Sequence, residues 1–161
     1  MAYKPRLFPS TLMEAILFIG IQGAGKSTFY QQRFFDTHVR ISLDMLRTRY
    51  RERIFLHACI LGKQPFVVDN TNVLITERER YITPAKEAGF RIVGYYFPVP
   101  VRHAIGRNQK REGKKKIPVQ GILGTQKRLQ APRRAEGFDQ IYCVTVTETN
   151  EFVVEECAEE E

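Results

Sequence analysis

The segment GIQGAGKST, residues 20–28, constrains the fold of this chain more than any other stretch. It satisfies the pattern G-x-x-x-x-G-K-[S/T], in which glycines let the backbone N–H groups converge on phosphate oxygens. The apolar run AILFI precedes it, and the segment KSTFYQQRFF that overlaps its end is typical of a helix. This context argues against a chance match on a flexible turn. The sequence therefore predicts a phosphate-binding loop between a strand and a helix.

Individual residues of this loop have separate expected roles. Lys26 brings a positive charge to the β- and γ-phosphates, and the Ser27 hydroxyl is a ligand for Mg²⁺. The start of the helix adds a partial positive charge. The predicted nucleotide contacts are Gly20, Gln22, Gly23, Ala24, Gly25, Lys26, Ser27 and Thr28.

Short apolar runs alternate with helical segments along the chain. The predicted strands are 15–19, 38–42, 65–70, 91–97 and 140–146. The predicted helices are 26–35, 43–61, 76–88, 100–111 and 118–130. Thr76 is the expected N-cap of its helix, which also contains Pro84. The alternation predicts an α/β P-loop NTPase fold, with a parallel five-stranded sheet, helices on both faces and ligands at the carboxyl ends of the strands.

Length and composition predict one P-loop domain, residues 1–150, followed by an acidic tail, residues 151–161. With 161 residues, of which 43% are hydrophobic, the chain can bury one core. No apolar run has the length of a membrane span, and the N-terminus lacks the apolar stretch of a signal peptide, so we expect a cytoplasmic protein. Cys59, Cys143 and Cys157 lack metal-ligand spacing and are expected to be buried or incidental thiols. The glutamate-rich tail is expected to be a frayed terminus, or alternatively to compete with polyanions.

Two segments after predicted strands carry candidate acceptor-site residues. Asp44 begins a helix and precedes Arg47 by one turn, which places a carboxylate and a guanidinium on one helix face. The carboxylate can accept the proton of an attacking hydroxyl, and the guanidinium can hold an acceptor phosphate. The alternative is a helix-capping aspartate followed by a solvated arginine.

The second segment is DNTN, residues 69–72. Asp69 directly follows the apolar run FVV, where a carboxylate assists Mg²⁺, usually through water. Asn70 and Asn72 are candidate substrate contacts, but asparagines also close strands as ordinary turn residues.

Positive charge is concentrated in the last third of the chain, within a net charge of +7. Arg107 and Arg111 are spaced to share a helical face and can neutralise charge on the transferred phosphoryl group. The loop from Gly113 to Ile117 is predicted to be a basic lid over the nucleotide. Between residues 102 and 134 the only acid is Glu112, and the basic residues are Arg102, Arg107, Lys110, Arg111, Lys114, Lys115, Lys116, Lys127, Arg128, Arg133 and Arg134. A solvated basic surface is the alternative interpretation of this run.

With these segments in this order, the chain resembles the kinase domain of the polynucleotide 5′-hydroxyl kinase family, within the P-loop kinases. The resemblance runs from about Ile16 to Val146 through GIQGAGKST, ISLDMLRTRY, FVVDNTNV, ERERYI, AKEAGFRIVGYYF, GRNQKREGKKKIP and EGFDQIY. The phosphate-binding loop is shared by very many proteins, whereas the D-x-x-R pair, the DNTN strand end and the R-x-x-x-R lid are more specific together.

The resemblance implies an ATP-dependent phosphotransferase with Mg²⁺. It implies that Lys26 and Ser27 serve phosphate and metal, that Asp44 is the general base, and that Arg47 contacts the acceptor's phosphate. Arg111, with Arg107 beside it, would stabilise the transferred phosphoryl group.

The predicted function is transfer of the γ-phosphate to a hydroxyl, with the 5′-OH of a nucleic acid, bound through its phosphates, as the expected acceptor. A small-molecule O-phosphotransferase, for a metabolite or an antibiotic, is the first alternative. A non-catalytic ATP-binding or nucleic-acid-binding module is the second.

Overall fold

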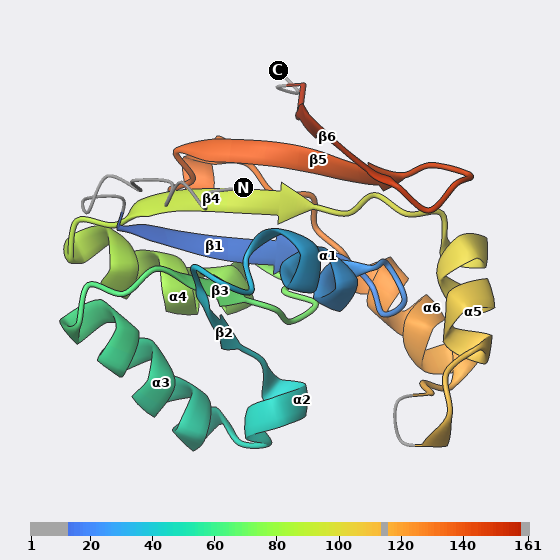
Figure 1. The fold of residues 1–161 in the computed structure, drawn as a ribbon, viewed down its shortest axis with the longest axis horizontal. Helices are drawn as coiled ribbons and strands as arrows, with labels where there is room; N and C mark the ends of the chain where they lie inside the picture. Colours follow the sequence, from blue (N-terminus) through green and yellow to red (C-terminus); the bar gives the residue numbers. More distant parts are fainter. Residues whose placement is uncertain (1–12, 114–115, 159–161) are drawn as a thin grey trace, which may run out of the picture.

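A mixed six-stranded sheet forms the centre of the computed structural model, which describes residues 13–113 and 116–158 (Figure 1). The strands lie in the order β2-β3-β1-β4-β5-β6. Their bounds are β1 Glu14–Ile19, β2 Val39–Ile41, β3 Phe66–Val68, β4 Arg91–Tyr96, β5 Gln140–Val146 and β6 Phe152–Glu156. The strands β1 to β5 pair in parallel, and only the β5–β6 pair is antiparallel. The α/β fold is therefore confirmed, and the predicted number of five strands is wrong.

Helices cover both faces of the sheet (Figure 1). Their bounds are α1 Lys26–Arg33, α2 Leu43–Leu46, α3 Arg49–Leu61, α4 Ile75–Glu87, α5 Val101–Gln109 and α6 Val119–Arg128. Successive residues of β1 point to opposite faces. Leu17 belongs to the core shared with α3 and α4, whereas Phe18 belongs to the core shared with α1. Among the described residues, none of the helices combines the length and the apolarity that a membrane crossing needs.

The sixth strand comes from the segment expected to be a frayed tail. β6 pairs with β5 from Val146↔Phe152 to Tyr142↔Glu156, so that expectation is wrong for Phe152–Glu156. The Phe152 ring lies 5.1 Å from the Phe29 ring of α1, which anchors the hairpin to the core. Residues 159–161 of the predicted tail lie outside the described residues.

The hairpin also changes the interpretation of the cysteines. Cys143 of β5 and Cys157, directly after β6, form a disulfide bond with their Cα atoms 5.1 Å apart. Cys59 is buried and free, as expected. The expectation of three separate thiols is wrong because it did not include the strand that brings Cys157 to Cys143.

The predicted helix 43–61 is two helices in the structure. Arg47 has φ 71°, which ends α2, and the Thr48 hydroxyl caps α3 by accepting a hydrogen bond from the Arg51 N–H at 3.1 Å. α4 begins at Ile75 after the N-cap residue Leu74, so Thr76 lies inside the helix and its predicted capping role is wrong.

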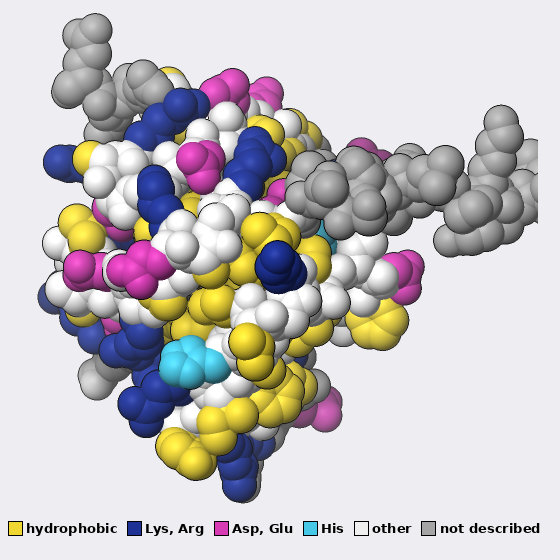
Figure 2. All heavy atoms as spheres, turned by 90° about the vertical axis from the view of Figure 1, so that its left-hand side faces the viewer, with side chains coloured by type: hydrophobic (Ala, Val, Ile, Leu, Met, Phe, Trp, Pro, Cys, Tyr) yellow, Lys and Arg dark blue, Asp and Glu magenta, His cyan; other side chains and the backbone are white. Residues whose placement is uncertain are grey.

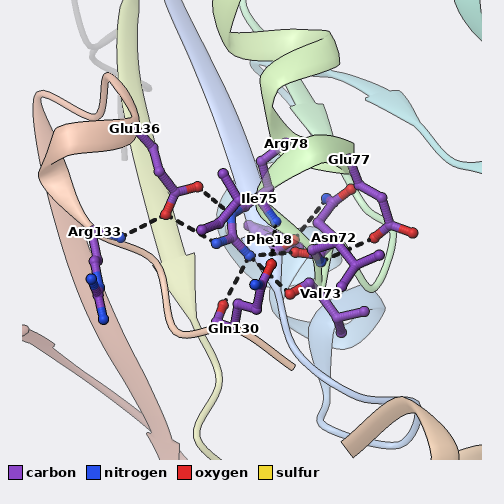
Figure 3. A network of polar contacts seen from close by, with 10 residues as sticks. Phe18, Asn72, Val73, Ile75, Glu77, Arg78, Gln130, Arg133 and Glu136 are labelled. Carbon is purple, nitrogen blue, oxygen red and sulfur yellow. Dashed lines mark hydrogen bonds and ion pairs between the residues drawn. The ribbon is translucent and has the colours of Figure 1, made fainter. Parts of the chain in front are cut away.

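A buried arginine ties α4 to the segment that follows α6 (Figure 3). The Arg78 side chain is fully buried and forms an ion pair with Glu136, with 2.6 Å between Nε and Oε1. Its Nη1 atom donates to the backbone carbonyls of Asn72, Val73 and Gln130 at 2.9, 3.2 and 3.0 Å. The Arg78 guanidinium therefore fixes the loop that follows β3.

Candidate active site

The phosphate-binding loop joins β1 to α1 and packs tightly against α5. Gly23 and Gly25 have φ angles of 78° and 96°, a backbone conformation that side chains disfavour. A Cβ atom on Gly23 would lie 2.5 Å from the Ala104 carbonyl oxygen of α5. Glycine at position 23 is therefore required both by the turn and by the close approach of α5.

Lys26 lies inside the phosphate-binding loop with its side chain buried. Its Nζ donates to the carbonyls of Gly20 and Ile21 at 2.9 and 2.7 Å, inside the loop. Burial lowers the pKa of Lys26 to about 8; Asp69 and Asp44 oppose this shift, and the positive charge of Arg111 adds to it. Asp44, Asp69 and Arg111 come from three separate segments, and the fold brings all of them within electrostatic reach of Lys26.

Ser27 and Asp69 lie side by side, as a magnesium site requires. The Ser27 hydroxyl donates to Asp69 Oδ2 at 2.9 Å, and the Asp69 carboxylate is almost fully buried at the end of β3. Among the described residues, no group of three or more His, Cys, Asp or Glu side chains could hold a metal. The donor set fits Mg²⁺ that takes its other ligands from nucleotide phosphates and water.

Arg40 of β2 joins this pair and was not among the predicted site residues. Its Nε and Nη2 atoms both lie 2.8 Å from Asp69 Oδ2, and Nη2 donates to the Ser27 hydroxyl at 3.2 Å. The signal in the sequence is a charged residue in the middle of the short apolar strand HVRIS. Only the pairing of β2 with β3, in which Arg40 is the register partner of Val67, brings it to the end of β3.

Asp44 lies in the first turn of α2 with its side chain exposed. The N-cap of α2 is Ser42, so the alternative in which Asp44 itself caps the helix is wrong. Arg47 is also exposed, but it has left the helix, so the two side chains do not share a helical face as predicted. α2 follows β2 directly, and from this position the charge of Asp44 acts on Lys26.

The two asparagines of the DNTN segment have structural partners. Asn70 Oδ1 accepts the Leu43 N–H at 2.9 Å, and its amide donates to Glu52 at 3.0 Å, so Asn70 holds the start of α2 against α3. The buried Asn72 amide donates to the Phe18 carbonyl at 2.8 Å. The structure thus engages both amides within the protein, and the predicted substrate contacts are not supported by this geometry.

The buried Glu52 carboxylate accepts hydrogen bonds from Arg49, Asn70 and Tyr81. This cluster predicts that the protein loses stability at alkaline pH. Burial, with the negative charge of Glu52 adding to it, raises the pKa of Tyr81 to about 12. An unfolded tyrosine has a pKa of about 10, so only the folded state keeps this proton between about pH 10 and pH 12. The stabilisation from Tyr81 is therefore complete below about pH 10 and is lost as the pH rises towards 12. Urea unfolding at stepped pH should show a steeper loss for the wild type than for Tyr81→Phe. Equal slopes would contradict this assignment.

The lid segment begins at the end of α5. Arg107 is partly buried, and its Nη1 donates to the Gly23 carbonyl at 3.4 Å, in contact with the phosphate-binding loop. Arg111 follows the end of α5 rather than lying within it, yet its charge acts on Lys26. The buried Asn108 side chain closes the loop by hydrogen bonding both the N–H and the carbonyl of Ile117. Lys114 and Lys115 of the predicted lid lie outside the described residues.

Two buried oxygens beside the site lack a hydrogen-bond partner in the described part of the chain. They are Gln22 Oε1, in the phosphate-binding loop, and Ser42 Oγ, at the start of α2. The Gln22 amide donates to the Thr125 hydroxyl of α6 at 3.1 Å, which links the loop to the helix after the lid.

Comparison with known proteins gives the same picture of the fold. The model of a family described as "AAA domain" matches residues 16–133. A gluconokinase from Sinorhizobium meliloti 1021 is similar at 18% identity and a TM-score of 0.57, over 83% of this chain and 82% of that chain. Kti12 from Chaetomium thermophilum, in complex with ADP-AlF3, is similar at 15% identity and a TM-score of 0.62, over 84% and 92%.

A sugar kinase from Janibacter sp. HTCC2649 is similar at 17% identity and a TM-score of 0.58, over 81% of this chain and 84% of that chain. At these identities the similarity shows a shared fold. The fold is that of the P-loop kinases.

Proposed function

This chain belongs to the AAA domain family, and from that premise we propose that it transfers the γ-phosphate of ATP to a hydroxyl group, the 5′-OH of a polynucleotide. The observation that carries the proposal is the phosphate-binding loop itself, which holds the Lys26 side chain and sets Ser27 against Asp69, with the charges of Asp44 and Arg111 acting on Lys26. A nucleotide-binding module without turnover has no need for a carboxylate at Asp44, on the acceptor side of the loop.

In the proposed reaction the acceptor oxygen attacks the γ-phosphorus, the bond from that phosphorus to the bridging oxygen of ADP breaks, and the hydroxyl proton passes to Asp44. Lys26 and Arg111 stabilise the negative charge of the phosphoryl group in flight. Ser27 and Asp69 would hold Mg²⁺, which would supply positive charge to neutralise the donor phosphates. Arg107 donates a hydrogen bond to the Gly23 carbonyl and so links α5 to the phosphate-binding loop.

The exposed face of α3 supports a nucleic acid as the acceptor. Tyr50 is 65% exposed and shares its outward face with Ile54 and Leu61, while Leu56 faces the core. The Arg53 guanidinium lies 6.0 Å from the centre of the Tyr50 ring. Exposed aromatic rings beside arginines are a usual means of binding single strands, through base stacking and phosphate contacts.

Charge on this part of the chain has the sign that a polyanion requires. Glu52, the single acid of the segment RTRYRER, is buried, bonds to Tyr81 and pairs with Arg49, so it offsets one of the four arginines of this segment. Figure 2 shows hydrophobic side chains gathered beside Lys and Arg side chains on the face that looks toward the viewer. The segment begins three residues after Asp44, so a strand whose 5′ end reaches Asp44 would continue over α3.

A small hydroxyl compound is the second candidate acceptor. It is favoured by the names of two similar structures, a gluconokinase and a sugar kinase. The two acceptors differ in salt dependence, because phosphate contacts with a polynucleotide weaken steeply as salt rises and contacts with an uncharged sugar do not.

Transfer of labelled γ-phosphate from Mg-ATP to a short oligonucleotide tests the proposal. We expect label on a 5′-OH oligonucleotide and none on the same strand with a 5′-phosphate. Label on gluconate or another sugar, with none on either strand, would move the assignment to the small-molecule reaction. ATP binding without transfer to any of these acceptors would support the non-catalytic alternative.

Arg47 provides a second test, directed at the acceptor. Arg47→Ala should raise the KM for the oligonucleotide and leave kcat nearly unchanged, because it removes a contact made equally in the ground state and the transition state. The slope of log affinity against log salt should fall by about 1. Arg80→Ala, which removes an exposed arginine of α4, is the matched control. An unchanged KM and salt slope would remove Arg47 from the acceptor site.

A further inference from the structure

The Arg40 side chain contacts the oxygens that would bind a metal cofactor in this site. Its guanidinium contacts the same two oxygens, Ser27 Oγ and Asp69 Oδ2, that are the candidate protein ligands of Mg²⁺. Mg²⁺ uses oxygen ligands, reached directly or through its own waters. The Arg40 guanidinium and Mg²⁺ would therefore bind the same two oxygen atoms.

The Arg40 ion pair is built into the fold rather than lying loosely on the surface. The Asp69 side chain is 2% exposed and that of Arg40 is 26% exposed. The Tyr30 ring of α1 lies 5.9 Å from the Arg40 guanidinium carbon, and the Tyr30 hydroxyl is fixed by the His38 carbonyl at 2.7 Å. The guanidinium is thus held between an aromatic ring and a buried carboxylate.

We propose that Arg40 is an internal counter-cation that competes with the nucleotide's metal ion for the Ser27–Asp69 pair. Before nucleotide binds, Arg40 neutralises Asp69. When metal and nucleotide enter together, the phosphates supply the additional ligands that let the metal displace the guanidinium. Arg40 thereby sets how much metal the protein needs. The inference rests on the metal-nucleotide half of the proposed function and is independent of the acceptor.

The direction in which metal affinity changes when Arg40 is replaced tests whether Arg40 competes with the metal. Binding of Mn²⁺ with ADP, followed by electron paramagnetic resonance at fixed pH, reports the metal affinity without any turnover. We expect Arg40→Gln to bind Mn²⁺·ADP about tenfold more tightly than the wild type, because a charge-assisted contact no longer has to be broken. Arg33→Gln is the control, since Arg33 is an exposed arginine of α1 that lies over the Phe29 ring. It should leave the affinity unchanged.

Unchanged or weaker Mn²⁺ binding in Arg40→Gln would overturn the proposal. The weaker result would instead make Arg40 a residue that orients Asp69 for the metal. Arg40→Lys guards against a folding defect, because it keeps a cation beside the buried Asp69 with fewer donors and should give an intermediate affinity. Thermal melting of each variant checks its fold. If neither the wild type nor Arg40→Gln binds Mn²⁺·ADP, the proposed nucleotide site fails as well. If the wild type binds Mn²⁺·ADP normally and Arg40→Gln binds it no more tightly, only the proposed role of Arg40 is wrong.

Discussion

Asp44→Asn should lower kcat for phosphoryl transfer by roughly 10² to 10⁴-fold, the range expected for loss of a general base. The affinity for ATP should stay nearly unchanged, because Asp44 is proposed to act on the acceptor hydroxyl and lies outside the phosphate-binding loop, residues 20–28. The amide has almost the same shape as the carboxylate but cannot take the proton of the attacking hydroxyl. Initial rates of label transfer and a nucleotide-binding titration measure the two quantities separately.

Asp36→Asn is the matched control, since Asp36 is an exposed aspartate after α1, away from the predicted site residues in the chain. It should leave both kcat and ATP affinity unchanged. Near-normal turnover in Asp44→Asn would mean that another group takes the proton or that none is needed. A loss of ATP affinity as large as the loss of turnover would instead place Asp44 in the nucleotide site.

Glu136→Ala should lower the free energy of unfolding by about 3–5 kcal/mol, the cost of leaving a buried charge without its partner. Arg78 is fully buried and Glu136 is nearly so, with bonds of 2.6 and 3.0 Å between them. The substitution would leave the buried Arg78 guanidinium without the carboxylate that pairs with it. Chemical denaturation measures the change, and a fall in Tm of about 10 °C should accompany it in a domain of this size.

The control for this prediction is the exposed ion pair between Arg134 and Glu156. Its side chains are 46% and 62% exposed, so Glu156→Ala should cost less than about 1 kcal/mol. If Glu136→Ala were no more destabilising than Glu156→Ala, the buried network in Figure 3 would not hold the β3 loop as its geometry indicates.

Much of the fold could be predicted because its signals are local. The observed strands β1 to β5 fall at the predicted apolar runs, and the helix after the phosphate-binding loop begins at Lys26 as expected. β6 was missed because its glutamates resembled a solvated tail, whereas alternate residues, Phe152 among them, pack toward the core. The break between α2 and α3 was missed because arginine at positive φ is uncommon and has no reliable sequence signal.

The candidate site shows the same division between local and long-range information. Lys26 and Ser27 follow from a short motif, and Asp69 follows from its position at the end of an apolar strand. Arg40 and the partners of Asn72 depend on which strands are neighbours in the sheet. A sequence pattern carries no record of such pairings, so a surface asparagine and an asparagine that bonds to the next strand look alike.

By itself, the sequence determined a phosphate-binding loop, an alternating α/β chain and a set of charged residues at strand ends. Each of these depends on residues close together in the chain, where backbone geometry and side-chain periodicity act directly. Only the tertiary structure decided that the charges of Asp44, Asp69 and Arg111 act on Lys26, that Arg40 pairs with Asp69, and that Cys143 bonds to Cys157. The contacts of the site arise because parallel strands align their carboxyl ends. The disulfide arises because β6 pairs with β5 in an antiparallel hairpin.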